Sequence, residues 1–253
     1  MKIDYYAYRS GMRRWNSGLK MFLAVVTLCL VTAFNKAAVS VFVILTMGTI
    51  TLGKGKIPWK AYVHFMAAPL AFMIFSGAAI AVELGNAPSG DWNVPVYFFW
   101  ICFFEENLIL AGSVFLKAMA GMSALYMISL STPVNELVLV LQKLHIPRLL
   151  IELMNLIYRY IFILLDVSEQ MQTAAKARMG YRTFRQSCKS FARIAGNLFL
   201  VSLKKANAYY DALLSRGYDG KLEFLSEENP PTGKQLVFAG LYVAALLGIA
   251  VMV

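Results

Sequence analysis

Long apolar runs, separated by short polar and basic segments, dominate the pattern of residues along the chain. A helix needs about 20 mostly apolar residues to cross the hydrocarbon core of a bilayer. The pattern therefore predicts about five transmembrane helices, at residues 19–34, 37–52, 61–84, about 107–130 and 235–253. The first two runs are slightly short for a span. Residues 94–104 form an aromatic piece that we expect at the membrane interface.

Polar and basic sequence replaces the apolar runs from residue 132 to about residue 234. Thr132-Pro133 opens a short amphipathic helix, because Ser131 or Thr132 can cap the helix and proline is tolerated in its first turn. Two longer helical patterns follow at residues 148–178 and 183–216. At about 1.5 Å per residue these helices would be roughly 46 Å and roughly 51 Å long.

Charge decides how these segments are placed relative to the membrane. The 253 residues are 59% apolar with a net charge of +10, which in a soluble protein would suggest nucleic acid as a partner. Here the basic residues lie between apolar runs, at residues 1–20, 53–60 and 143–221. The last of these segments carries 13 Lys or Arg and five Asp or Glu. Basic loops of membrane proteins face the cytoplasm. We therefore expect a cytoplasmic N-terminus, an outer C-terminus and no nucleic-acid partner.

Together these patterns predict an all-α fold, a polytopic membrane protein with about five transmembrane helices and a cytoplasmic domain of long amphipathic helices. Three regions follow from the pattern. Residues 1–131 form an N-terminal membrane region with about four spans, residues 132–234 form the cytoplasmic helices, and residues 235–253 form the last transmembrane helix.

Residue types that carry chemistry are sparse. The three cysteines have no paired spacing, and the two histidines, His64 and His145, are far apart in sequence. The sequence has no Gly-x-x-x-x-Gly-Lys-Ser/Thr stretch for ATP and no constellation typical of a hydrolase. We therefore expect a non-catalytic chain that holds neither a metal ion nor a cofactor.

Charged residues near or inside a span need separate comment, because charge in a bilayer is costly and usually faces protein or water. Lys117 lies deep within the fourth predicted span. We interpret it as a partner for Glu83, Glu105 or Glu106, with a proton or ion path as the alternative. Placement of Glu105 and Glu106 at the outer interface is the alternative for these two acids.

Two similar signatures end the two long helical patterns. The first reads Ala177-Arg178-Met179-Gly180, and the second reads Ser215-Arg216-Gly217; a tyrosine follows each. Gly180 and Gly217 can take the left-handed conformation that closes a helix, and arginine in the last turn complements the helix dipole. Each signature alone could be a well-capped helix end. Their repetition favours a pair of contact points for two equivalent grooves on a dimeric partner.

These residues resemble a known family. The segment LSTPVNELVLVLQKLHIPRLLIELMNLIYRYIFILLDVSEQMQTAAKARMGYR and the later ALLSRGYDG are similar to the transmembrane T component of energy-coupling factor (ECF) transporters. AYRSGMRRWNSGLK and IPWKAYVHFMAAPLAF resemble its cobalt-type branch, CbiQ. The family's signatures are Ala-Arg-Gly-like. Ser215-Arg216-Gly217 meets that pattern, whereas the first signature has Met179 inserted before the glycine.

The resemblance implies a coupling subunit in the cytoplasmic membrane of a bacterium or archaeon. Such a subunit joins an integral-membrane substrate-binding component, such as a cobalt-binding membrane protein, to two ABC-type ATPase subunits, which bind the ATP. The residues that would couple to the ATPases are those of the two signatures: Ala177, Arg178, Gly180, Ser215, Arg216 and Gly217. Cobalt is the favoured substrate, with nickel or a vitamin as alternatives. A carrier that conducts its solute unaided is the alternative from a different class.

Overall fold

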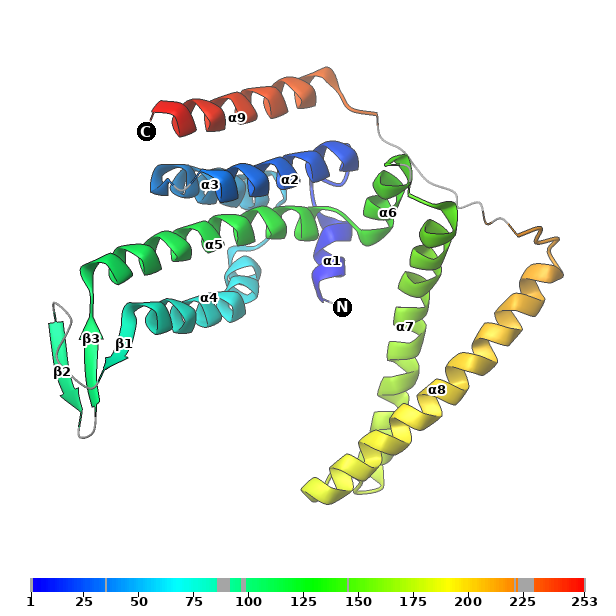
Figure 1. Cartoon of the computed structure of the whole chain (residues 1–253). Helices are drawn as coiled ribbons and strands as arrows, with labels where there is room; N and C mark the ends of the chain where they lie inside the picture. Colours follow the sequence, from blue (N-terminus) through cyan, green and yellow to red (C-terminus); the bar gives the residue numbers. More distant parts are fainter. Residues whose placement is uncertain are drawn as a thin grey trace. The chain divides into compact units, whose positions relative to one another are not determined.

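The computed structural model describes residues 2–34, 36–85, 92–96, 99–144, 146–220, 222 and 230–252. The chain forms two compact units, which Figure 1 colours along the sequence. Residues 1–137 with 228–253 form the first, here called the membrane unit, and residues 138–227 form the second, here called the helix-pair unit.

Apolar helices make up most of the membrane unit. In the described part of the chain, four helical segments are long and apolar enough to cross a membrane: α3 (Ala37–Thr49) with the π-helix η1 (Ile50–Lys54), α4 (Trp59–Ala81), α5 (Glu105–Ser131) and α9 (Gly233–Met252). The apolar helix α2 (Ser17–Ala33) has 17 residues, at the lower limit for a span. A short helix, α1 (Lys2–Arg9), precedes them. The five predicted segments are thus confirmed as helices.

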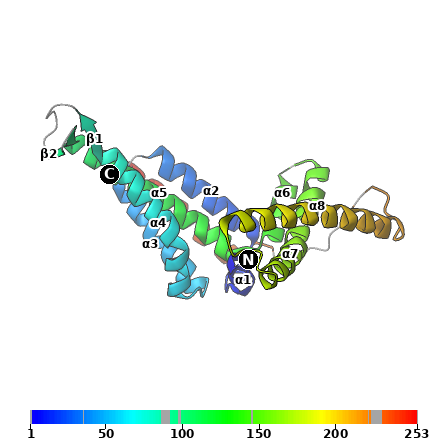
Figure 2. The same ribbon diagram turned by 90° about the horizontal axis from the view of Figure 1, so that it is seen from below.

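Small and medium apolar side chains form the core between α2, α3, α5 and α9. Val39, Val43, Ala120 and Ala124 are completely buried there. Figure 2 shows α2, α3, α4 and α5 running side by side. Large apolar residues, such as Phe75 of α4 at 76% exposure, lie on the outside. This distribution suits a membrane, where small residues let helices approach closely and lipid covers the bulky ones.

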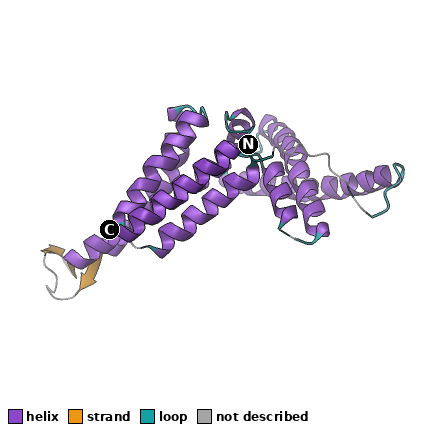
Figure 3. Cartoon of the chain, turned by 90° about the horizontal axis from the view of Figure 1, so that it is seen from above, coloured by secondary structure: helices purple, strands orange, loops and turns teal. Residues whose placement is uncertain are grey.

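A small antiparallel sheet follows α4, and the sequence analysis did not predict it. Its strands are β1 (Val82–Gly85), β2 (Trp92–Val96) and β3 (Phe99–Phe103), in the order β1-β3-β2. Figure 3 shows these strands in orange, and in the chain β1 directly follows α4 and β3 precedes α5. The predicted third span therefore ends at Ala81, and the interfacial aromatic piece is largely strand. Short runs rich in aromatic and β-branched residues favour strands, and Pro95 fits because β2 is an edge strand.

The helix-pair unit consists of long helices with little burial. α6 (Val134–Lys143) leads into it, followed by α7 (Arg148–Ala177) and α8 (Phe184–Leu214), which confirms the three predicted helices. α7 has 30 residues and α8 has 31, so they are roughly 45 Å and 46 Å long. All residues of both helices are described, and α8 has no buried side chain.

Candidate functional site

α7 ends in a turn that satisfies its last carbonyl groups. The N–H of Gly180 donates to the carbonyl of Ala175 over 2.8 Å, and the N–H of Met179 donates to that of Lys176 over 3.1 Å. This pair of hydrogen bonds forms a Schellman motif, which places a left-handed residue just after the helix. Met179 is that residue, with φ of 56°, and Arg178 directly precedes it.

α8 ends in the same motif. The N–H of Tyr218 donates to the carbonyl of Leu213 over 3.1 Å, and the N–H of Gly217 donates to that of Leu214 over 3.0 Å. Gly217 is the left-handed residue, with φ of 77°, as the sequence analysis predicted. Arg216 directly precedes it.

The two motifs align Arg178 with Arg216 and Met179 with Gly217. Gly180 does not have a positive φ, so the prediction that it takes the left-handed conformation is wrong. Met179 is not an extra residue before the glycine, because it occupies the same position in the motif as Gly217. A side chain in this conformation costs roughly 1 kcal/mol. This cost arises at the end of α7, where Met179 is left-handed, and not at the end of α8, where the left-handed residue is Gly217.

Gly180 is needed because the turn has no room for a side chain at this position. A Cβ atom at this position would lie 2.6 Å from Oγ of Ser190 and 2.8 Å from the carbonyl oxygen of Ala175. The Ser190 hydroxyl donates to the carbonyl of Gly180 over 2.8 Å. Thr183 then caps α8, because its Oγ1 accepts the N–H of Gln186 over 3.3 Å. These contacts fix the direction in which α8 leaves α7.

Each predicted set of signature residues lies at one end of α8. Ala177, Arg178 and Gly180 lie at the end of α7 and in the turn that precedes α8, and Ser215, Arg216 and Gly217 directly follow α8. The 31 residues of α8 therefore separate the two arginines by roughly 46 Å. Both arginine side chains are exposed, and within the described residues neither guanidinium has a hydrogen bond or ion pair. Each is therefore available to a partner.

Aromatic contacts join the middle of α7 to α8. The rings of Tyr160 and Tyr209 meet edge to face, with centroids 5.7 Å apart, and the guanidinium of Arg159 lies 5.7 Å from the centre of the Tyr209 ring. Partial burial raises the pKa of the Tyr160 hydroxyl above its usual value. These contacts hold the helices by ring packing and cation–π attraction.

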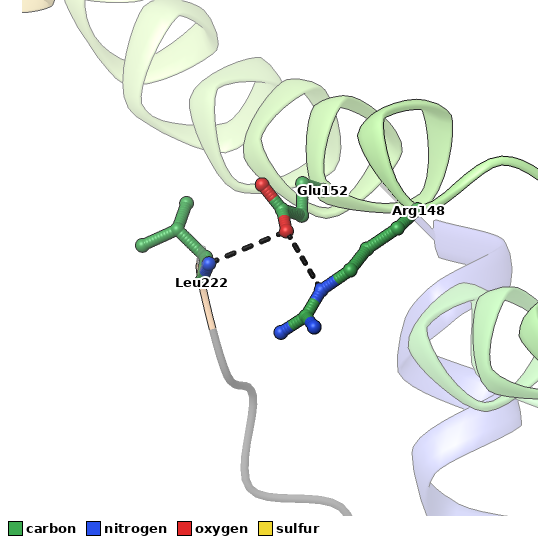
Figure 4. Close-up of polar contacts among 3 residues, drawn as sticks. All are labelled: Arg148, Glu152 and Leu222. Atoms are coloured by element: carbon green, nitrogen blue, oxygen red, sulfur yellow. Dashed lines mark hydrogen bonds and ion pairs between the residues drawn. The ribbon is translucent and has the colours of Figure 1, made fainter. Parts of the chain in front are cut away.

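A buried carboxylate ties the chain beyond α8 to the start of α7 (Figure 4). Glu152 is 6% exposed, and its Oε1 accepts the Nε–H of Arg148 over 3.2 Å and the N–H of Leu222 over 3.3 Å. We call these three residues the clasp. Glu152 was not among the site residues predicted from the sequence. The four-residue spacing of Arg148 and Glu152 on one helix was the available signal, but the approach of Leu222 is a tertiary contact.

Candidate metal ligands are scattered. Among the described residues, no three His, Cys, Asp or Glu side chains form a group that could hold a metal ion. His64 is exposed and lies against the ring of Phe65, with centroids 6.1 Å apart. The other histidine, His145, lies outside the described residues.

Lys117 is half-buried within α5. No carboxylate in the described part of the chain forms an ion pair with it. The pairing with Glu83, Glu105 or Glu106 that the sequence suggested is therefore not formed.

Comparisons with known proteins agree on one family. Residues 9–225 match the family CbiQ, described as cobalt transport protein. An uncharacterized protein of Methanocaldococcus jannaschii is 29% identical over 98% of this chain and 92% of its own length. A putative fused cobalt transport protein CbiMQ of Methanocorpusculum labreanum is 28% identical over 98% of this chain and 41% of its own length. The cobalt transport protein CbiQ of Salmonella typhimurium is 28% identical over 64% of this chain and 72% of its own length.

The apolar helices and these matches define the class as a multi-pass membrane transport protein. The chain belongs to the CbiQ family of cobalt transport proteins. The family resemblance recognised in the sequence is thereby confirmed.

Proposed function

We propose that this chain is the non-catalytic coupling subunit of an ECF-type ABC importer. It would transmit motion from two cytoplasmic ATPase subunits to a membrane substrate-binding component. The observation that carries the proposal is the pair of equivalent Schellman motifs, each with an exposed arginine that has no hydrogen bond or ion pair to any described side chain.

The chemistry of the two arginines suits this role. A guanidinium is always charged and can form two parallel hydrogen bonds to one carboxylate, or reach backbone carbonyls. Two identical ATPase subunits offer two equivalent grooves, so two equivalent motifs on one chain can each enter a groove. ATP would be bound and hydrolysed by the ATPases, and this chain would hold no cofactor.

The apolar surface of the long helices supports a membrane partner. Phe184 is 87% exposed, Phe191 73% and Phe199 62%. Large exposed apolar patches mark protein or membrane interaction sites. We propose that the substrate-binding component covers part of this surface.

Cobalt is the proposed substrate, because two of the relatives described above carry cobalt transport in their names. The fused relative, of which this chain matches 41%, supports a second cobalt transport protein as the membrane partner. Nickel or a vitamin remains the alternative substrate. The test is uptake of radiolabelled cobalt, with excess nickel as competitor, in cells that express the whole complex.

The proposed orientation places the N-terminus in the cytoplasm. Hydrogen bonds gather the N-terminal segment and several helix ends at one end of the membrane unit: Gly11 N–H to Gly55 O at 3.2 Å, Lys20 Nζ to Ser131 O at 3.1 Å and Asn16 N–H to Gln235 Oε1 at 3.5 Å. The basic segments 1–20 and 53–60 lie at this end. The preference of basic segments for the cytoplasm then sets the orientation.

The decisive experiment is a pull-down of the cognate ABC-type ATPase by the full chain in detergent. We expect Arg178→Glu and Arg216→Glu each to weaken binding by at least about 30-fold, because losing a buried charged contact costs roughly 2–5 kcal/mol. Arg193→Glu is the matched control, because it makes the same charge change on an exposed residue within α8. Normal ATPase binding by both signature variants would reduce the motifs to helix caps and reopen the unaided-carrier alternative.

A further inference from the structure

A groove opens on the membrane unit between α3 with η1 on one side and α9 on the other. Its volume is about 430 Å³, and its walls include Phe42, Gly53, Phe238 and Leu241. The rings of Phe42 and Tyr242 stack within it, with centroids 6.2 Å apart. All of these residues belong to helices that are apolar and long enough to span a membrane, so the groove lies in the membrane-spanning part of the unit.

Polar atoms along the groove already have partners within the protein. The hydroxyl of Thr46 donates to the carbonyl of Phe42 over 2.8 Å, and that of Thr49 donates to the carbonyl of Thr46 over 2.9 Å. The Tyr242 hydroxyl accepts a hydrogen bond from Thr27 over 3.2 Å. The groove therefore offers an apolar lining, which suits a hydrocarbon chain better than a polar solute.

One end of the groove carries positive charge. The Nζ of Lys54 is exposed and lies 4.1 Å from the centre of the Phe238 ring and 4.6 Å from that of Trp15. Lys234 precedes Phe238 by four residues on α9, which places both on one face of that helix. Lys54 ends η1 and Lys234 lies in the first turn of α9, so both lysines lie at the ends of spans, where lipid headgroups lie.

We propose that this groove binds one acyl chain of an anionic phospholipid, with the headgroup phosphate against Lys54. The apolar walls would contact the acyl chain, and the lysine at the mouth would attract the anionic headgroup. Basic pockets between transmembrane helices bind anionic headgroups in this way. The two aromatic rings hold the lysine at the mouth, where its N–H groups can donate to phosphate oxygens.

Gly53 allows the groove to be filled without disturbing the fold. A Cβ atom at Gly53 meets no other atom within 4 Å, and its backbone does not have a positive φ. Because Gly53 also lines the groove, we expect Gly53→Leu to narrow it. Gly48→Leu is the matched control, because Gly48 lies in α3, has equally open surroundings and does not line the groove.

The test is native mass spectrometry of the full chain in detergent, with equal amounts of phosphatidylglycerol and phosphatidylcholine added. Wild type and Gly48→Leu should retain one phosphatidylglycerol, and Gly53→Leu should retain about tenfold less. Lys54→Gln should lower the preference for phosphatidylglycerol about fivefold, whereas Lys60→Gln, a change at an exposed lysine outside the groove, should not.

Three results would overturn the proposal. The first is equal retention of the two lipids by wild type, and the second is equal lipid retention by wild type and Gly53→Leu. The third is a photo-cross-linker at Leu241 that joins a protein partner, and not lipid, in the complex isolated from cells, because the groove would then be a protein contact.

Discussion

The membrane unit and the helix-pair unit hold their helices in different ways. In the membrane unit, side chains of α2, α3, α5 and α9 form a core in which several residues are completely buried. In the helix-pair unit, α8 has no buried residue among the 31 that the structure describes, and α7 has two, Ile151 and Glu152. The pair is held by a tight turn, a ring contact and the clasp. Few contacts therefore set the positions of the two arginines.

This contrast has a functional meaning under the proposed role. The membrane unit must keep its shape during the transport cycle, and a well-packed core gives it that rigidity. A coupling element must change position when its partners move, and a helix pair with few buried contacts allows it. Substitutions at Lys20, Gly180, Met179 and Gly217 test this contrast.

Lys20 tests how strongly the membrane unit depends on a buried charge. Its side chain is completely buried, and its Nζ donates to the carbonyls of Met12 over 3.2 Å and Ser131 over 3.1 Å. Lys20→Ala removes the Lys20 hydrogen bond to the Ser131 carbonyl and a cation from the C-terminal end of α5, while the Met12 carbonyl keeps the N–H of Trp15 at 3.0 Å. We expect a loss of roughly 3–5 kcal/mol in stability, measured by thermal unfolding in detergent.

Lys60→Ala is the control for this prediction, because Lys60 is exposed at the start of α4. It should leave the unfolding temperature unchanged. A Lys20→Ala protein as stable as the Lys60→Ala protein would show that the buried hydrogen bonds contribute nothing.

Gly180 tests the turn between the long helices. Gly180→Ala forces its Cβ against Ser190 and the Ala175 carbonyl, at a cost of roughly 1–3 kcal/mol. The turn should open, and trypsin should cleave after Arg178 faster than in wild type.

Gly196→Ala is the matched control for the turn. Gly196 lies in α8 with no atom near its would-be Cβ, so alanine there should stabilise the helix slightly. Equal cleavage rates in the two variants would mean that close packing at Gly180 does not hold the turn.

The aligned positions Met179 and Gly217 test the equivalence of the two helix ends. Met179→Gly should remove the strain of a left-handed side chain, and Gly217→Ala should introduce it, each by roughly 1 kcal/mol. Hydrogen exchange of the Gly180 amide should slow up to about fivefold in the first variant, and that of the Tyr218 amide should quicken similarly in the second. Changes of the same sign in both variants would contradict the alignment.

Much of this fold follows from local pattern. Apolar runs of span length indicated the membrane helices, and three-to-four-residue periodicity indicated α6, α7 and α8 to within about two residues at most ends. The sheet at residues 82–103 was missed, because a short aromatic run reads equally well as an interfacial segment, and only the pairing of β3 with two neighbours makes it a strand.

The signature residues show the same division. The sequence located both arginines and their helix ends, because caps and helix ends are local features. It assigned the left-handed position to Gly180, since glycine is the usual residue there. In the structure Gly180 packs closely against Ser190, ten residues further on, where a side chain would not fit. The left-handed residue is Met179.

The class of this protein, its helices and the two arginine-bearing helix ends could be predicted from the residue pattern, because hydrophobic periodicity and helix capping act over a few residues. Which polar groups are buried depends on the folded chain. Lys20 looked like an ordinary basic residue of the N-terminal segment, and Glu152 like one acid among many bases. Each is buried because backbone groups distant in sequence, at Ser131 and at Leu222, come within hydrogen-bonding distance once the chain has folded.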